Sequence, residues 1–213
     1  MFRRVYRRLF CQQDGIQAKK RVNMLVKELI RKAIHICAAF VPLLLHLAYY
    51  PVMVSLAAVL VLYCLAEWSR CRGRPVPVIS AITMVAARKR DEDRFVLGPV
   101  TLALGVLVTA ALFPPLPAAV GILALAFGDG LASLVGRCFG RTRIPCTGGK
   151  TAVGSLACFA AIFCSTYALT GRASIALGCA LVGTAFELAP LKDLDNLVIP
   201  IAISCFCQFY FHL

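Results

Sequence analysis

Repeated apolar runs, each long enough to cross a bilayer, are the feature that most limits what this chain can fold into. A helix needs about 20 mostly apolar residues to span the hydrocarbon core of a membrane. Hydrophobic residues make up 60% of the chain, whereas soluble domains are typically about 45–50% apolar. The runs are continuous rather than alternating, which argues against a membrane β-barrel. The sequence therefore predicts an all-α, multi-pass membrane protein.

We expect about seven transmembrane helices joined by short connectors. Their expected ranges are about Arg31–Tyr49, Val52–Trp68, Phe95–Phe113, Leu116–Val135, Ala152–Leu169, Ala173–Leu188 and Leu197–Phe211. Residues 1–30 form a basic N-terminal segment, and residues 31–213 form a single transmembrane domain. Two amphipathic pieces, residues 22–30 and 76–90, are expected to lie at the membrane interface, with solvated loops as the alternative.

The basic residues fall on alternate connectors, and this pattern sets the expected orientation. All of the 23 Lys and Arg residues except Arg172 lie before or at the start of the first expected helix, or in the connectors after the second, fourth and sixth. Positive charge marks the cytoplasmic side, so the sequence predicts a cytoplasmic N-terminus and a C-terminus outside. Orientation and contact with the anionic lipid bilayer explain the net charge of +13 without nucleic acid.

An acidic residue lies inside the fourth expected helix. Asp129 stands between Gly128 and Gly130, and an ionisable residue at membrane depth is costly enough to mark a functional site by default. Arg137 follows at a distance of about 12 Å along a helix. The flanking glycines could let the helix unwind and bring the two closer. The alternative is a structural ion pair between Asp129 and an arginine neighbour.

The expected topology gathers further polar residues on the cytoplasmic side. They are Arg31, Lys32, His35, Glu67, Arg137, Arg141, Arg143, Lys150, Glu187, Asp193, Asp195 and Asn196. Carboxylates beside cations suit a polyphosphate bound to Mg²⁺, which favours one or two carboxylates plus phosphate oxygens. The candidate metal ligands are Asp129, Glu187 and Asp195, and the candidate phosphate contacts are Arg137 and Lys150. Structural roles stay open for Glu67 and His35, and topology alone would explain Arg141 and Arg143.

The segment Gly148-Gly149-Lys150-Thr151 resembles the end of a phosphate-binding P-loop. The full pattern needs a further glycine at position 144, which is Ile144, and a buried strand before it. A P-loop is therefore not expected. At the start of the fifth helix the segment can still present backbone N–H groups to an anion.

Four short elements together resemble those of the CTP-dependent lipid kinases, the family of dolichol kinase, phytol kinase and CTP-using diacylglycerol kinase. In chain order they are Arg31-Lys32-x-x-His35, then Gly128-Asp129-x-x-Ala132-x-x-x-Gly136-Arg137-x-x-Gly140, then Lys150-Thr151-x-x-Gly154-Ser155, and last Asp195-Asn196-x-x-x-Pro200 with Glu187 before it. The order matches the family, and the elements cover residues 31–200. Thr147 and Gly149 depart from the pattern, because relatives often carry a more polar run there.

The resemblance implies an enzyme that transfers the γ-phosphate of CTP to a lipid alcohol, such as a polyprenol or dolichol, a phytol-like prenol or diacylglycerol. It implies Mg²⁺ as cofactor and an active site on the cytoplasmic face of a bacterial inner membrane or the endoplasmic reticulum. The implied catalytic residues are Asp129, Lys150 and Arg137. The implied nucleotide or phosphate contacts are Arg31, Lys32, His35, Gly128, Gly136, Thr151, Gly154, Ser155 and Asn196. The implied metal ligands are Asp129, Glu187 and Asp195.

Two other functions stay open. The related phosphatidate cytidylyltransferases, which make CDP-diacylglycerol, share a similar layout, but they are usually longer and their late motif is richer in Asp and Lys. A small ion-coupled transporter would use Asp129 and Glu187 in an ion path. That function predicts acids spread through the bilayer depth, whereas the acids here gather at one end of the expected helices.

Overall fold

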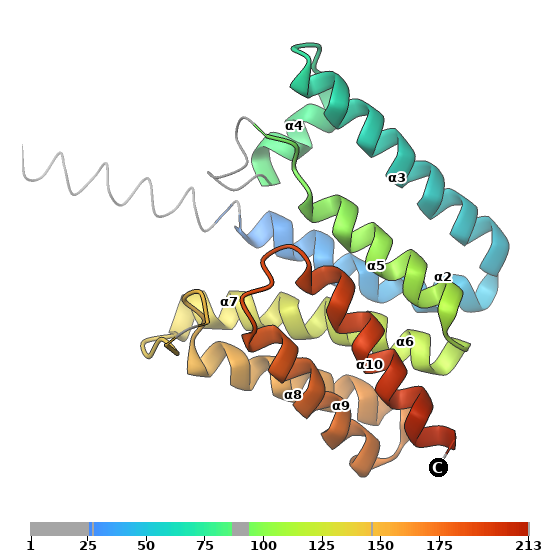
Figure 1. Ribbon diagram of the computed structural model, residues 1–213, viewed down its shortest axis with the longest axis vertical. Helices are drawn as coiled ribbons and strands as arrows, with labels where there is room; N and C mark the ends of the chain where they lie inside the picture. Colours follow the sequence, from blue (N-terminus) through green and yellow to red (C-terminus); the bar gives the residue numbers. More distant parts are fainter. Residues whose placement is uncertain (1–25, 27, 87–93, 146, 213) are drawn as a thin grey trace, which may run out of the picture.

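The computed structural model describes residues 26, 28–86, 94–145 and 147–212, which fold as a bundle of helices (Figure 1). A first helix, described from Glu28 onward, continues through the 3₁₀ turn η1 (Ala38–Phe40) into α2 (Val41–Leu47). The others are α3 (Tyr49–Cys71), α4 (Pro77–Ala86), α5 (Gly98–Leu112), α6 (Pro115–Leu123), the π-helical turn η3 (Ala124–Asp129), α7 (Gly130–Phe139), α8 (Ala152–Thr170), α9 (Ala173–Leu188) and α10 (Asp195–His212).

Four of the described helices are long and apolar enough to cross a membrane: Glu28–Leu47, Tyr49–Cys71, Pro115–Phe139 and Ala152–Thr170. Three further helices are also apolar but shorter: Gly98–Leu112, Ala173–Leu188 and Asp195–Phe211. The all-α prediction is confirmed, and each expected helix has a counterpart whose ends differ by a few residues. That all seven span the bilayer stays a prediction.

The two expected interfacial pieces are only partly described. Helix α4 lies within the range 76–90, so a helix forms there. Residues 1–25, residue 27 and residues 87–93 lie outside the described part of the chain, and with them most of the basic N-terminal segment over residues 1–30.

The long helix Pro115–Phe139 occupies the centre of the bundle. In its most apolar window 61% of the residues are buried, against 6% in Tyr49–Cys71. Helices α3 and α4 lie on one flank of it, and α8 and α9 lie on the other (Figure 1). Polar residues of the central helix are therefore shielded from lipid by the protein itself.

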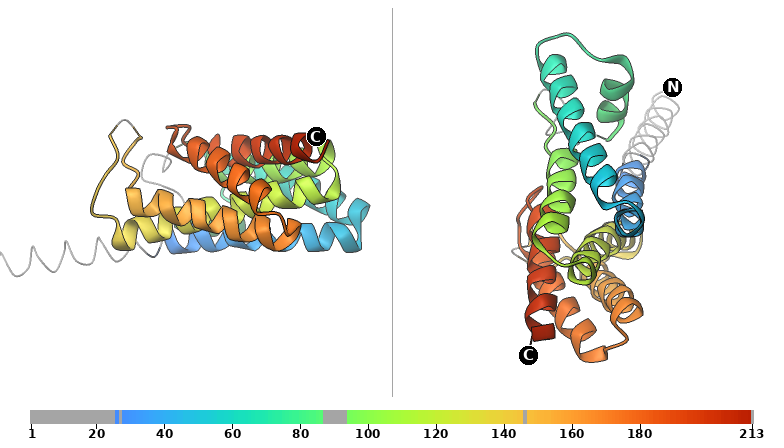
Figure 2. Two further views of the ribbon diagram at one scale, coloured as in Figure 1. Left: turned by 90° about the horizontal axis from the view of Figure 1, so that it is seen from below. Right: turned by 90° about the vertical axis from the view of Figure 1, so that its right-hand side faces the viewer.

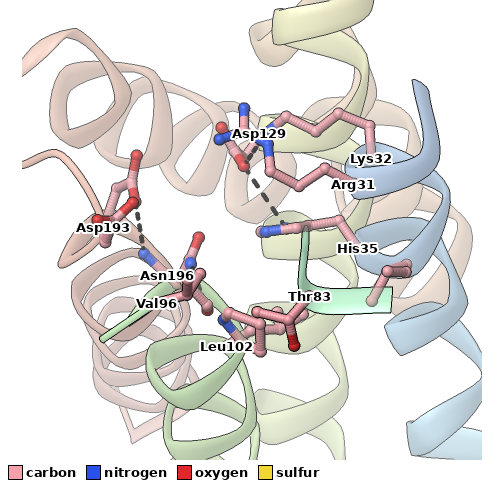
Figure 3. A pocket seen from close by; sticks show the side chains of 13 residues that line it. Arg31, Lys32, His35, Thr83, Val96, Leu102, Asp129, Asp193 and Asn196 are labelled. Atoms are coloured by element: carbon pink, nitrogen blue, oxygen red, sulfur yellow. Dashed lines mark hydrogen bonds and ion pairs between the residues drawn. The ribbon is translucent and has the colours of Figure 1, made fainter. Parts of the chain in front are cut away.

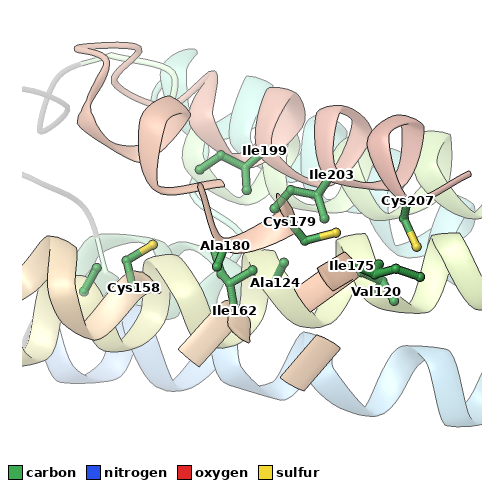
Figure 4. Close-up of a cluster of buried hydrophobic side chains, with 11 residues drawn as sticks. Val120, Ala124, Cys158, Ile162, Ile175, Cys179, Ala180, Ile199, Ile203 and Cys207 are labelled. Atoms are coloured by element: carbon green, nitrogen blue, oxygen red, sulfur yellow. The ribbon is translucent and has the colours of Figure 1, made fainter. Parts of the chain in front are cut away.

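Two clusters of buried side chains hold the bundle together. One joins the central helix to α8, α9 and α10, and Figure 4 shows its isoleucines spread along these helices: Ile162, Ile175, Ile199 and Ile203. The second joins the first helix to α5 and the central helix through Ala38, Leu102, Val106, Ile122 and Leu125. Because lipid is as apolar as these side chains, close packing rather than water exclusion stabilises such contacts inside a membrane.

Glycines let α10 approach its neighbours closely. A Cβ on Gly105 of α5 would lie 2.1 Å from the Asn196 carbonyl oxygen. A Cβ on Gly121 of α6 would lie 2.4 Å from the Pro200 carbonyl oxygen. Both contacts are too short for any real side chain, so these positions fix where α10 begins and place Asp195 and Asn196 beside α5.

The helix does not unwind at Asp129, although the flanking glycines would allow it. Asp129 ends the π-helical turn η3, and α7 continues directly from it. A π turn takes extra residues while keeping its backbone hydrogen bonds, and such turns are frequent at functional sites. A π turn is suited to a membrane-spanning helix, because unpaired backbone N–H and C=O groups are costly in the bilayer.

Candidate active site

Most of the polar residues singled out in the sequence gather at one end of the bundle. The connectors between α7 and α8 and between α9 and α10 meet there, beside the beginning of the first helix (Figure 2). The opposite end carries the turn between α5 and α6 and the end of α10. The clustering that the sequence predicts is therefore present in the described residues.

Asp129 is buried and contacts two side chains of the first helix. Its carboxylate forms an ion pair with the Lys32 ammonium group, and its Oδ2 lies 3.5 Å from Nδ1 of His35 (Figure 3). Lys32 and His35 lie one turn apart on the same face of the first helix, so both reach η3. The partner of Asp129 is thus a lysine of another helix and not an arginine neighbour.

Arg137 is held by a carboxylate that sequence reasoning did not assign to the site. Its Nη2 lies 3.0 Å from Oε2 of Glu28, and the other oxygen of Glu28 pairs with Arg31. Glu28 is 6% exposed, whereas the Arg137 side chain is 44% exposed. Glu28 lies one helical turn before Arg31, and that spacing is the signal in the sequence that links them.

Lys150 and Ser155 meet at Glu187. Nζ of Lys150 lies 3.2 Å from Oε1 of Glu187, and the Ser155 hydroxyl donates to Oε2 over 3.1 Å. Thr151 caps α8, because its side-chain oxygen accepts the Gly154 N–H over 3.2 Å. The Lys-Thr-x-x-Gly-Ser element is therefore the first turn of α8, fastened to the end of α9.

The connector before α8 doubles back on itself. The Ile144 N–H donates to the Lys150 carbonyl over 2.8 Å, and the Ala152 N–H donates to the Thr142 carbonyl over 3.2 Å. Gly148 and Gly149 have φ values of 72° and 96°, which only glycine adopts readily. This turn returns the chain to α8 and places Lys150 beside Glu187.

Gly136 and Gly154 let α7 and α8 cross closely. A Cβ on Gly136 would lie 2.8 Å from the Thr151 side-chain oxygen, and one on Gly154 would lie 2.7 Å from the Ala132 carbonyl oxygen. Gly128 instead packs against Ile162 of α8. These glycines have a packing role in the structure, and nucleotide contact by any of them stays a prediction.

Asn196 ties α10 to the beginning of α5. Its side-chain amide donates to the Thr101 hydroxyl over 3.0 Å and to the Gly98 carbonyl over 3.3 Å. The Asp195 carboxylate accepts the Asn196 backbone N–H over 2.9 Å. Asn196 is buried, so its first role is to position this junction.

Two pockets of different character meet at Asp129. The larger has about 1180 Å³ of empty space and is lined mainly by polar and glycine residues, among them Glu28, Arg137, Gly136, Thr147, Gly148, Gly149, Lys150, Thr151, Gly154, Glu187 and Lys192. The smaller has about 630 Å³ and is lined by Ile34, His35, Thr83, Val96, Gly98, Pro99, Leu102, Asp193 and Asn196. Arg31, Lys32, Asp129 and Asp195 line both.

The carboxylates suit a cation that is shared with a ligand. Among the described residues no group of three or more His, Cys, Asp or Glu side chains could hold a metal ion by itself. Asp129 and Asp195 border the larger pocket together, and Mg²⁺ commonly uses one or two carboxylates and takes its other ligands from phosphate and water. Glu187, the third expected ligand, is engaged by Lys150 and Ser155.

The structure separates the expected site residues into two groups. The larger pocket gathers Arg31, Lys32, Asp129, Gly136, Arg137, Lys150, Thr151, Gly154, Glu187 and Asp195, and His35 and Asn196 line the smaller one. Gly128 and Ser155 line neither pocket: Gly128 packs against Ile162, and the Ser155 hydroxyl donates to Glu187. Arg141 and Arg143 are exposed and also lie outside both pockets.

Comparison with known proteins gives two distant relatives. A protein of unknown function from Methanocaldococcus jannaschii is 27% identical over 155 residues, covering 72% of this chain and 76% of that protein. A protein of Oryza sativa subsp. japonica, named as a probable chloroplastic phytol kinase, is 24% identical over 214 residues, covering 89% of this chain. The match spans 65% of the Oryza protein's length, slightly less than two thirds. No family model and no solved structure matches.

Proposed function

We propose that this protein is a membrane kinase that transfers the γ-phosphate of CTP to the hydroxyl group of a lipid alcohol. The observation that carries the proposal is the pair of pockets that share Asp129, one basic and polar and the other mostly apolar at its inner wall. The phosphates of a nucleotide need a polar, basic site, and a lipid chain needs an apolar one. The two sites must meet where the phosphate is transferred. The distant similarity to a probable phytol kinase supports the same reaction class.

The larger pocket would take the nucleotide phosphates. Arg31, Arg137 and Lys150 reach it from three different segments. Phosphoryl transfer depends mainly on positioning and on neutralising charge, and these cations supply both. Glu28 and Glu187 hold the cations in place before the nucleotide binds. Mg²⁺, held by Asp129 and Asp195, would neutralise the phosphate oxygens further.

The reaction would take place between the two pockets. The acceptor oxygen forms a bond to the γ-phosphorus, the bond from that phosphorus to the bridging oxygen of CDP breaks, and the hydroxyl proton leaves. Asp129 faces both pockets, so it can draw off this proton from the smaller pocket as well as border the cation position. Lys32 and His35 fix the carboxylate for that task.

The proposal includes a membrane orientation. Seven spans with a cytoplasmic N-terminus would put the site on the cytoplasmic face of a bacterial inner membrane or the endoplasmic reticulum, where CTP is available. The charges support it, because Arg137, Lys150 and Lys192 lie in or beside connectors at the site end, whereas Arg172 lies between α8 and α9 at the other end.

Mass spectrometry of the lipid product tests the function. Purified protein in detergent is incubated with Mg²⁺ and CTP, in one reaction with a lipid alcohol and in a second with phosphatidate, and extracted lipids are compared with reactions that lack CTP. The proposal predicts a lipid heavier by one phosphate group, with CDP released. Phosphatidate carrying a cytidylyl group, with pyrophosphate released, would instead identify a cytidylyltransferase. Absence of any CTP-dependent lipid product would overturn both.

A further inference from the structure

We infer that Lys192, in the connector between α9 and α10, is a further contact for the phosphates of the nucleotide. It belongs to none of the four sequence elements that mark the site. The inference rests on the proposed function and deepens it, because it adds a residue to the phosphate side of the site. Three observations carry it: the place of Lys192 in the larger pocket, its lack of a carboxylate partner, and the backbone conformation at this position.

Lys192 reaches the larger pocket from the side of the α9–α10 connector. It lines that pocket, as does Pro190 of the same connector. The connector lies against the glycine turn before α8, since a Cβ on Gly148 would be 4.0 Å from the Pro190 Cβ. Asp193, the next residue along the chain, lies across the smaller pocket from Lys32 (Figure 3). Lys192 therefore approaches the site from a different side than the cations of the first helix.

The other basic side chains of the larger pocket are each neutralised by a carboxylate. The pairs are Arg31 and Arg137 with Glu28, Lys32 with Asp129, and Lys150 with Glu187. Lys192 is exposed and forms no ion pair with any residue that the structure describes. The described lining holds five basic and four acidic side chains, so Lys192 supplies its excess positive charge. Binding of a polyphosphate depends on neutralising its charge, and Lys192 has its charge available for that.

The backbone at Lys192 has a conformation that lysine rarely adopts. Its φ is 58°, and among the described residues it is the only one other than glycine with a positive φ. The Leu194 N–H donates to the Leu191 carbonyl over 3.1 Å, so Lys192 is the second residue of a β-turn. Glycine, asparagine and aspartate are preferred at such a position. Strain of this kind is often found at ligand-binding sites, whereas a turn that only joins two helices would favour glycine here.

Titration of the purified full-length protein with CTP and Mg²⁺ tests the inference. Calorimetry in a neutral detergent, without a lipid acceptor, gives the Kd for CTP. Lys192→Met removes the charge and should raise that Kd by about tenfold, because a charge-assisted contact is lost. Lys192→Arg keeps the charge and should bind CTP as the parent protein does. Arg141→Ala removes one charge from an exposed position outside both pockets and should leave the Kd unchanged.

The outcomes separate this inference from the proposed function. Equal Kd values for CTP in the parent protein and in Lys192→Met would overturn the role of Lys192 and leave the kinase function standing. An equal loss of affinity in Lys192→Met and Arg141→Ala would also overturn it, since only the general positive charge would then matter. If the parent protein does not bind CTP at all, the proposed function itself fails.

Lys192→Gly separates binding from folding. Glycine adopts a positive φ without strain, so Lys192→Gly should melt at a higher temperature than Lys192→Met. Its Kd for CTP should nevertheless be raised as much as that of Lys192→Met, because the charge is absent from both. A residue that serves only the turn predicts parent-like CTP binding in Lys192→Gly, and that result would contradict the inference.

The phosphate of an anionic lipid headgroup offers the same chemistry as a nucleotide phosphate. Repeating the titrations with phosphatidylglycerol in the micelles distinguishes the two sources. We expect Lys192→Met to bind CTP more weakly than the parent protein in neutral micelles as well as in anionic ones. A difference that is present only with phosphatidylglycerol would assign Lys192 to the lipid surface and overturn its role in nucleotide binding.

Discussion

At the scale of single residues, the site is built from charges that neutralise one another across helices. Asp129 is paired with Lys32, Arg31 and Arg137 with Glu28, and Lys150 with Glu187. A buried pair need not stabilise the fold, but removing one partner leaves an uncompensated charge. Each pair can therefore be tested for function and stability separately.

Asp129→Asn should lower the rate of lipid phosphorylation by about 100-fold or more, because the proton acceptor and the cation contact are both lost. It should also lower the free energy of unfolding by about 3 kcal/mol, since Lys32 is left buried without a countercharge. Activity is measured by phosphate transfer, and stability by loss of folded protein on heating. The double variant Asp129→Asn with Lys32→Met should recover stability but not activity. Recovery of activity in the double variant would refute the catalytic role of Asp129.

Arg137→Ala should lower kcat/KM for CTP by about tenfold to hundredfold, because one phosphate contact is removed. Arg141→Ala is the matched control, since Arg141 is exposed nearby and lines neither pocket. Steady-state kinetics with varied CTP separates the two. A similar loss in both variants would mean that only the general positive charge of the connector matters.

At the scale of helices, the crossing of α7 and α8 positions the phosphate side of the site. Gly154→Ala should cost about 1–3 kcal/mol, because its methyl group would meet the Ala132 carbonyl oxygen at 2.7 Å. Gly98→Ala is the control, since a Cβ there meets no described atom within 4 Å. Thermal unfolding in the same detergent compares the two. Equal melting temperatures would show that the crossing can relax.

A second helix-scale feature anchors the wall of the smaller pocket. Glu67 is fully buried at the end of α3, receives two hydrogen bonds from Arg70, and accepts the Val96 N–H. Arg70 also donates to the Arg94 carbonyl over 2.7 Å. The open question from the sequence, whether Glu67 is a helix-end residue, thus has an answer: it fastens the segment that leads into α5.

Glu67→Leu should release that segment. The Val96 amide should exchange its hydrogen at least about tenfold faster, because a hydrogen bond to a charged group is lost. Hydrogen exchange followed by mass spectrometry of peptides over residues 94–102 measures this. Ser69→Ala, which removes only an exposed hydroxyl bond to Arg74, serves as control. Unchanged exchange in Glu67→Leu would contradict the anchoring role.

At the scale of the whole molecule, the apolar runs predict the helices and their order, because length and hydrophobicity are properties of one segment at a time. The partners of Asp129 and Arg137 could not be predicted in the same way. Lys32 and Glu28 reach them across helix crossings that depend on glycine contacts and on the π turn at Asp129. Leu102 and Thr83 in the lining of the smaller pocket were also missed, since ordinary helix residues give no signal of their own.

The proposed orientation predicts which thiols a reagent can reach. Cys138 is exposed at the site end of α7, and position 172 lies in the opposite connector. In variants with one cysteine each, an impermeant maleimide added to intact cells should label Arg172→Cys and leave Cys138 unlabelled until the membrane is opened. The reverse pattern would invert the topology.

The most direct test of the central claim follows the label of CTP into lipid. Purified protein with Mg²⁺, phytol and phosphatidate receives CTP labelled at either the γ- or the α-phosphate, and the lipid is extracted and counted. The account predicts label in lipid from γ-labelled CTP alone, and none from the Asp129→Asn protein. Label that reaches lipid only from α-labelled CTP, with phosphatidate as the acceptor, would contradict it.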